Sequence, residues 1–249
     1  MKIDESIIFI TVVFLFAGWV KGVVGMGLPT VAMGALGLVM QPVQAAALLV
    51  VPSMVTNVWQ FVAGPGKKTI AIRLASMMLC VCLGTAIGIH FLTSDSSRWP
   101  SVALGAVLAI YALLTLFLPK FVVPSRSEHT LSPIVGIVTG ILTGATGVFV
   151  VPAVPYLSSL DLNKDELVQA LGFSFTVSTI ALALGLGIKS SFSSDALFVS
   201  FFAVIPALFG MFIGQYTRDR INPVAFRKWF LVAMLILGSY MVLKGLAGC

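Results

Sequence analysis

Charged side chains are scarce in this chain of 249 residues, of which Asp, Glu, Lys and Arg together make up only 10%. Soluble globular proteins carry about 25% charged residues, so this scarcity excludes an ordinary soluble domain. Hydrophobic residues make up 59% of the sequence, and its mean hydropathy is +1.07. Windows of about twenty residues outside a few short loops are therefore apolar enough to cross a bilayer, which predicts an all-α polytopic membrane protein.

Histidine and cysteine are also rare, with two and three residues respectively. Cys80 and Cys82 stand two residues apart in one apolar segment, so they face different sides of a helix, and Cys249 is distant in sequence. No second cysteine pair and no nearby histidine completes a metal site. We therefore expect no metal, no cofactor and no catalytic residues.

Basic residues outnumber acidic ones, and the formal net charge is +6. No basic patch alternates with aromatic residues, so we expect no nucleic-acid partner. In membrane proteins Lys and Arg concentrate in cytoplasmic loops. Four regions fit that placement and hold ten basic residues, namely Lys67, Lys68, Arg73, Lys120, Arg126, Lys164, Arg218, Arg220, Arg227 and Lys228. Four others would lie outside: Lys2, Arg98, Lys189 and Lys244. This topology predicts a protein of the cytoplasmic (inner) membrane with both termini external.

Glycine and proline divide the apolar sequence into segments of unequal length. The segments are 5–24, 29–40, 42–64, 69–93, 99–118, 132–146, 148–158, 165–189, 194–216 and 223–246. Three of them, 29–40, 132–146 and 148–158, are too short to cross, because a crossing needs about twenty residues. They flank glycine-rich breaks at Gly25–Pro29 and Gly144–Gly147, which predicts discontinuous helices or helical hairpins.

The sequence also resembles itself in two halves. Four matches keep their order while the shift between them grows from 118 to 129 residues, as loop insertions would produce. They pair Gly18 and Gly22 with Gly136 and Gly140, Ala47 and Thr56 with Ala170 and Thr179, 84–88 with 210–214, and Tyr111 with Tyr240. We expect a first membrane repeat at 1–120, a cytoplasmic linker at 121–131 and a second membrane repeat at 132–249.

The charge pattern orients the two repeats oppositely. It forces segment 42–64 to run inward and its counterpart 165–189 to run outward, and each broken pair to leave and return on one side. Inverted repeats with discontinuous helices at matching positions are typical of secondary transporters. We expect each repeat to hold one broken or hairpin helix pair plus three transmembrane helices, with a substrate site near the midplane between the repeats.

The two breaks supply the first candidate binding residues, which are Gly25, Gly27, Pro29, Gly144 and Gly147. A new helix is expected to begin near Pro29 and another near Val148. Helix N-termini expose unpaired N–H groups with partial positive charge, so two such starts pointing at one centre would form an anion cradle. Small residues also pack transmembrane helices together. That simpler role is expected for Gly18, Gly84, Gly136 and Gly210.

Polar side chains in the same regions supply further candidates, namely Asn57, Gln60, Thr143, Thr146, Ser174 and Ser178. Asn57 and Gln60 stand three residues apart on one helix face, and Ser174 and Ser178 stand four apart. Each could donate a hydrogen bond to an oxyanion. The hydroxyl groups could equally bond back to the carbonyl four residues earlier in their own helix.

Lys21 is the one basic residue deep inside an apolar segment. A charge within the membrane points to function. The predicted topology nevertheless puts Lys21 toward the inner end of its helix, where its side chain could reach the interface. Both interpretations stay open at the level of sequence. No buried carboxylate pair accompanies Lys21, which speaks against proton coupling through a central Asp or Glu.

Several stretches resemble the sulfite exporter family (TauE/SafE), a group of bacterial and archaeal anion permeases. They are 22-GVVGMGLPTV-31, 41-QPVQAAALLVVPSMVTNVWQ-60, 140-GILTGATGVFVVPAVPYL-157 and 169-QALGFSFTVST-179. The resemblance extends over essentially the whole chain, including the G-x3-G helices at 84–88 and 210–214. One departure concerns the second break, where the family often has G-x-G-G and this chain has Gly144-Ala-Thr-Gly147.

The resemblance implies a secondary transporter that moves a small anion, sulfite or an organosulfonate, typically outward and without ATP hydrolysis. Other members are proposed to carry other organic anions. A membrane-embedded enzyme would need a polar catalytic set at membrane depth, which this sequence lacks. An accessory subunit without transport of its own would explain the helices but not the two matched breaks. The expected partners are a small anionic substrate and the lipid bilayer, and the oligomeric state is left open.

Overall fold

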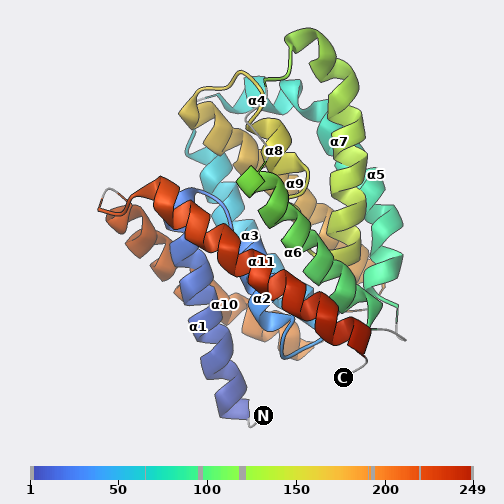
Figure 1. The fold of residues 1–249 in the computed structure, drawn as a ribbon, viewed down its shortest axis with the longest axis vertical. Coiled ribbons are helices and arrows are strands. Elements are labelled where there is room, and N and C mark those ends of the chain that lie inside the picture. The colour runs from blue at the N-terminus through green and yellow to red at the C-terminus, as the bar shows by residue number, and fades with distance from the viewer. Residues whose placement is uncertain are drawn as a thin grey trace.

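The structure is a computed structural model that describes residues 3–64, 66–94, 98–117, 122–189, 191, 194–218 and 220–247 (Figure 1). These residues form α helices joined by turns, and none of them lies in a strand. The helices are α1 (Ile3–Val24), α2 (Leu28–Leu36), α3 (Pro42–Val62), α4 (Lys67–Arg73), α5 (Ala75–Leu92), α6 (Trp99–Phe117), α7 (Ser125–Thr146), α8 (Ala153–Leu157), α9 (Lys164–Ile188), α10 (Ser194–Thr217) and α11 (Pro223–Ala247).

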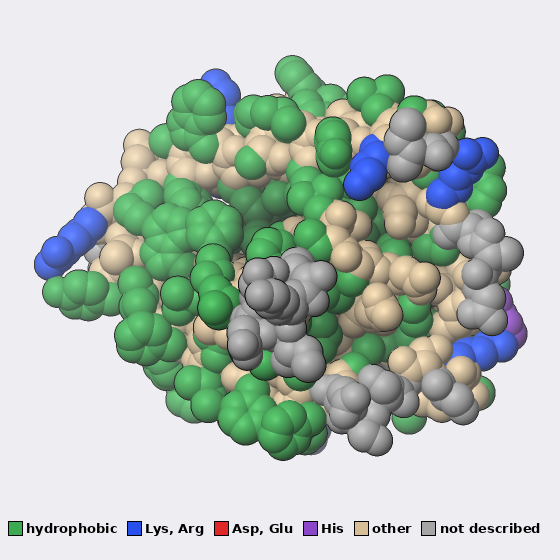
Figure 2. Space-filling view, turned by 90° about the horizontal axis from the view of Figure 1, so that it is seen from below, with side chains coloured by type: hydrophobic (Ala, Val, Ile, Leu, Met, Phe, Trp, Pro, Cys, Tyr) green, Lys and Arg blue, Asp and Glu red, His purple; other side chains and the backbone are tan. Residues whose placement is uncertain are grey.

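Eight of these helices are long and apolar enough to cross a membrane: α1, α3, α5, α6, α7, α9, α10 and α11. Large apolar side chains stay exposed along them, as a bilayer environment requires. Figure 2 views the end of the bundle that carries both chain ends, and it shows apolar side chains over most of that face with Lys and Arg toward its rim. The predicted all-α polytopic membrane protein is thus confirmed.

Helix α7 corrects one prediction. Segment 132–146 is not a short helix, because α7 has 22 residues and begins at Ser125, within the expected linker. Pro124 precedes the first turn in an extended conformation, and Glu128 lies in that turn, where a negative charge suits the helix dipole. The polar residues of 125–131 therefore form the exposed start of a membrane-crossing helix.

The second break differs from the prediction as well. No helix begins near Val148, because residues 148–152 are not helical and α8 begins at Ala153 with only five residues. Proline pushes the residue before it out of the helical conformation. Val151 precedes Pro152, so the helix cannot begin earlier than that proline. The first break agrees better, since α2 begins at Leu28, one residue before Pro29.

The packing is compatible with two inverted repeats. Helix α1 packs along α10 and α7 packs along α5, while α3 pairs with α9 and α6 pairs with α11. If the two halves are exchanged, the α1–α10 pairing becomes the α7–α5 pairing. The α3–α9 and α6–α11 pairings each join two equivalent helices and stay the same. Figure 1 shows α1 rising from the N-terminal end of the bundle while α7 descends toward it, so the equivalent helices run in opposite directions.

Close glycine contacts hold the two long pairings together. A Cβ atom added at Gly22 would lie 2.8 Å from the Cα of Gly214, and one at Gly140 would lie 2.9 Å from the Cα of Gly84. At Gly18 the added atom would lie 2.1 Å from a backbone oxygen of α10. Only glycine lets the helices approach this closely. The packing role expected for Gly18, Gly84, Gly136 and Gly210 accounts for all four residues.

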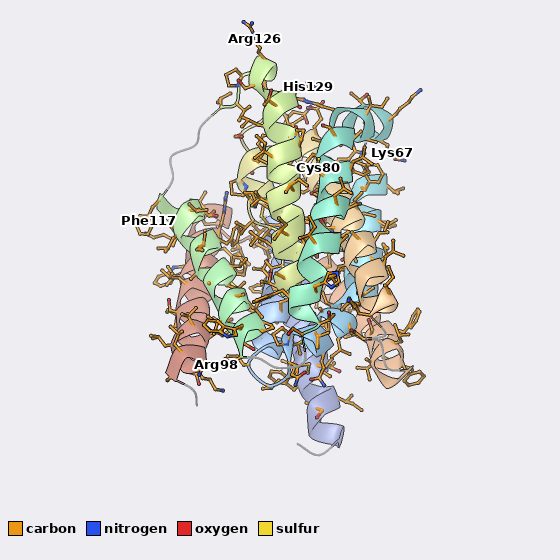
Figure 3. The ribbon with its side chains drawn as sticks, turned by 90° about the vertical axis from the view of Figure 1, so that its right-hand side faces the viewer. Lys67, Cys80, Arg98, Phe117, Arg126 and His129 are labelled. Atoms are coloured by element: carbon orange, nitrogen blue, oxygen red, sulfur yellow. The ribbon has the colours of Figure 1, made fainter. Side chains whose placement is uncertain are left out.

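The two ends of the bundle carry different groups. Figure 3 shows Lys67 and Arg126 at one end, here called the basic end, and Arg98 at the other. The first and last helical residues, Ile3 and Ala247, share the end with Arg98, here called the terminal end (Figure 1). Lys67 and Arg126 were expected in the cytoplasm and Arg98 outside, so the structure separates them as that topology requires.

Candidate functional site

A buried lysine is the centre of the candidate site. Lys21 lies in the last turn of α1 and is only 3% exposed. Its Nζ atom donates hydrogen bonds to Thr56 Oγ1, at 3.0 Å, and to Asn57 Oδ1. Both partners belong to α3 and are fully buried. The side chain therefore points into the protein and does not extend to the membrane surface.

The hydrogen-bond partners of Lys21 carry no charge. Thr56 and Asn57 are neutral, and the salt bridge found among the described residues joins Arg73 to Glu128 instead. An ammonium group buried without a counter-ion is costly, because it gives up its hydration for two neutral acceptors. A bound anion would supply the missing negative charge.

Two equivalent threonines lie where α3 and α9 pack together. Asn57 Nδ2 donates to Thr179 Oγ1 at 3.3 Å, which links the lysine cluster to α9. Thr56 and Thr179 each donate their own proton to the carbonyl four residues earlier, to Pro52 O at 2.8 Å and to Phe175 O at 2.6 Å. Their oxygen atoms consequently act as acceptors for Lys21 and Asn57.

Pro52 shapes the part of α3 that carries these groups. A proline inside a helix has no N–H for the carbonyl four residues earlier. Here that carbonyl, Leu48 O, accepts a hydrogen bond from Ser200 Oγ of α10 at 2.8 Å. The buried Ser200 thus compensates the interruption and ties α10 to the site helix.

Gln60 connects the first break to α9. Its Nε2 atom donates to Gly25 O at 3.0 Å and to Val168 O at 2.9 Å. Gly25 has φ +81°, a left-handed conformation that glycine adopts readily. The next residue of α9, Gln169, donates to Phe61 O at 2.9 Å and accepts from Gly66 N at 2.9 Å. These two amides hold the end of α3 and the end of α1 against α9.

A pocket of about 410 Å³ lies beside these groups. Gly64 follows the end of α3, and the exposed Asp165 lies in the first turn of α9, so the mouth of the pocket is at the basic end. Lys21 lies on its inner wall. Its lining residues are Lys21, Gly22, Gly25, Trp59, Gln60, Ala63, Gly64, Asp165, Val168, Gln169, Met211, Gln215 and Arg218. Four predicted site residues thus lie together. Lys21, Gly25 and Gln60 line the pocket, and Asn57 is connected to it through its hydrogen bond with Lys21.

The predicted residues of the second break lie elsewhere. A Cβ atom at Gly147 would meet the Met33 side chain of α2 at 2.9 Å. The Thr143 and Thr146 hydroxyls donate to Thr139 O and Leu142 O of their own helix, both at 2.7 Å. A Cβ atom at Gly144 would lie 2.5 Å from Thr85 O, so this glycine serves the packing of α7 against α5.

The structure therefore does not bring the two breaks to one centre. Gln60 donates to both Gly25 O and Val168 O, so Gly25 lies near the start of α9. Gly147 instead packs near Ala46, at the start of α3. Those two helix starts lie at opposite ends of the bundle (Figure 1). The physical reason is that α1 and α7 are complete 22-residue helices, so each break comes after a crossing rather than in its middle.

The remaining predicted residues are buried near the site without lining the pocket. Gly27 precedes α2 with φ +111°, and Pro29 occupies its first turn. Ser174 and Ser178 of α9 are fully buried, and their hydroxyls have no hydrogen-bond partner. Thr56, Thr179 and Gln169 were not predicted. The sequence match of Thr56 with Thr179 between the halves is the signal that could have identified the first two.

A second hollow, of about 150 Å³, lies at the terminal end. Arg98, Ser101 and Lys244 line it together with Leu38, just after α2, and Met241 of α11. It shares no residue with the Lys21 pocket. The Lys21 pocket remains the candidate site, because it joins a buried charge to a network of buried amides and hydroxyls.

Eight apolar helices around a buried polar cluster define a multi-pass membrane protein. The model of the family Sulfite exporter TauE/SafE matches residues 10–241, nearly the full chain, so this protein belongs to that family. No curated protein and no solved structure matches the chain. The family is one of membrane permeases for sulfur-containing anions, which confirms the resemblance found in the sequence.

Proposed function

We propose that this protein is a secondary transporter that moves sulfite or an organosulfonate across the cytoplasmic membrane, with the Lys21 pocket as its binding site. The observation that carries the proposal is the buried lysine whose partners, Thr56 and Asn57, are both neutral. An anion in the pocket neutralises this charge where water cannot. The family supports a sulfur-containing anion as the substrate.

The chain's own groups would replace the water around the anion. The Lys21 ammonium has three donors, and Thr56 and Asn57 engage two of them, so one is left for the ligand. Hydrogen bonds between a charged donor and a charged acceptor are about twice as strong as neutral ones. Arg218 at the pocket lining adds positive charge, while Asp165 lies nearby and disfavours a second anion.

Transport would proceed by alternating access. The pocket opens at the basic end, whereas the second break is filled by Phe149, whose ring packs on that of Phe175 in the middle of α9, with 5.2 Å between the ring centroids. The two inverted halves would rock around the Lys21 site, so that each break in turn faces a pocket. In this proposal the basic end is cytoplasmic, both termini are external, and no chemical conversion of the anion takes place.

Anion flux into proteoliposomes tests the proposal. Purified protein is reconstituted, and uptake of sulfite, sulfate, thiosulfate, short sulfonates and short carboxylates is measured with and without a pH gradient. Selective flux of one sulfur oxyanion or sulfonate is expected. Selective flux of a carboxylate would keep the transporter but change its substrate, and no flux of any anion would favour an accessory subunit.

A further inference from the structure

Most buried threonines among the described residues bond to their own helix. A Ser or Thr in a helix can donate to the carbonyl three or four residues earlier, which satisfies the hydroxyl without any other partner. Buried threonines that do so are Thr56, Thr85, Thr143, Thr146 and Thr179. This bond is thus the usual one for a buried threonine in these helices.

A second set of buried hydroxyls makes no such bond. Five of them are fully buried and have no hydrogen-bond partner: Thr30, Ser53, Thr139, Ser174 and Ser178. A buried polar group without a partner costs stability, and the bond to the helix carbonyl was within reach. Their unused donors therefore require an explanation other than the packing of the helices.

Three of these hydroxyls lie on α3 and α9, the helices that surround the Lys21 cluster, and a fourth lies on α7. Ser53 is one turn before Asn57 and on the same face of α3. Ser174 and Ser178 stand one turn apart in the middle of α9, and Ser178 adjoins Thr179, the partner of Asn57. Thr139 of α7 occupies the position that the internal repeat pairs with Lys21, at a shift of 118 residues.

We propose that Ser53, Ser174, Ser178 and Thr139 form the continuation of the anion path from Lys21 across the middle of the membrane. This inference rests on the proposed function. Each hydroxyl donates to the passing anion, so the path fits a small oxyanion with several acceptor oxygens and a single compact charge. In the present conformation the path is closed, since the four side chains are fully buried.

If the inference is correct, removing one of these hydroxyls should raise the stability of the protein and lower its anion flux. Replacing an unpartnered buried hydroxyl by hydrogen removes a cost from the folded state and a donor from the path. Replacing a hydroxyl that bonds to its own helix does the reverse. Thr176 is the matched control, because it is the repeat-equivalent of Ser53 at a shift of 123 residues and donates to Gly172 O at 2.7 Å.

The experiment compares Ser53→Ala, Ser178→Ala and Thr176→Val with the wild type. Sulfite or sulfonate flux is measured in proteoliposomes, and the thermal unfolding midpoint is measured in detergent. Ser53→Ala and Ser178→Ala are expected to lower flux by roughly tenfold and to raise the midpoint by about 2–4 °C. Thr176→Val is expected to keep wild-type flux with a lower midpoint.

Three outcomes would overturn the inference. Wild-type flux in Ser53→Ala and Ser178→Ala would remove these residues from the path while the proposed function stands. A lower midpoint together with lower flux would assign them a structural role. A wild-type chain that moves no anion would overturn the proposed function itself, and this inference with it.

Discussion

At the scale of single residues, the site depends on a lysine that the membrane should not tolerate. Lys21 gains two hydrogen bonds from α3 but no counter-ion, so it lowers the stability of the empty protein. Its sequence position alone left open whether it extends to the interface. The packing of α1 against its neighbours shows that Lys21 does not extend to the interface, because the residue is only 3% exposed.

Replacing Lys21 by methionine tests its role directly. Lys21→Met keeps the length of the side chain and removes the charge, so anion flux in proteoliposomes should fall by about 10- to 100-fold. The thermal midpoint should stay unchanged or rise, because a buried unpaired charge is lost. Lys244→Met is the control: Lys244 is an exposed lysine of α11, and the variant should keep its flux. Equal flux in both variants would contradict the site.

At the scale of helices, the sequence predicts the crossings well and the breaks less well. Apolar length identifies α3, α6, α9, α10 and α11 nearly to the residue. It misses the start of α7, because residues 125–131 are polar and a polar run reads as a loop. It misses the short length of α8, because hydropathy does not register how one proline and three valines disfavour a helix at 148–152.

Helix contacts give a stability prediction with an internal control. In Gly140→Val the new Cβ atom would lie 2.2 Å from Val81 O, so α5 and α7 must separate. We expect a loss of about 2 kcal/mol or more and a lower thermal midpoint in detergent. A Cβ atom at Gly187 of α9 would meet nothing within 4 Å, so Gly187→Ala should keep the stability or raise it by up to about 1 kcal/mol. Equal midpoints in the two variants would contradict the packing.

At the scale of the whole molecule, the two halves form one site only after folding. The candidate cradle was predicted from both breaks, yet the structure assembles its polar cluster from α1, α3 and α9, and the second break packs on α2, α3 and the middle of α9 instead. Sequence indicates which residues are polar and where helices stop. It does not indicate how far each break lies along the membrane normal, because that depends on the full length of α7.

An ion pair joins the halves at the basic end. Arg73 of α4 donates to both oxygens of Glu128 of α7, at 2.7 and 2.8 Å. The hydrogen bonds that Arg73 donates to the Glu128 carboxylate raise the pKa of the guanidinium, so Arg73 stays charged up to strongly alkaline pH and its contribution to stability is lost only as pH rises through the raised value.

Breaking this pair should weaken the attachment of α4 to α7. Arg73→Ala is expected to cost about 1–2 kcal/mol, since the contact is bidentate but partly exposed to solvent. Arg73→Lys should recover only part of that loss, because a lysine cannot bond both oxygens in the same planar geometry. Arg126→Ala, at an exposed position of α7, serves as the control in thermal unfolding. A midpoint for Arg73→Ala equal to that of Arg126→Ala would show that the pair contributes nothing.

The orientation of the molecule in the membrane gives the last prediction. Figure 3 shows Lys67 and Arg126 at the basic end and Arg98 at the opposite end. From the excess of basic residues we predict that the basic end faces the cytoplasm. With the three native cysteines replaced by alanine, Arg98→Cys should react with a membrane-impermeant maleimide in intact cells, whereas Lys67→Cys and Arg126→Cys should react only after permeabilisation. The reverse pattern would invert the topology, and with it the side to which the Lys21 pocket opens.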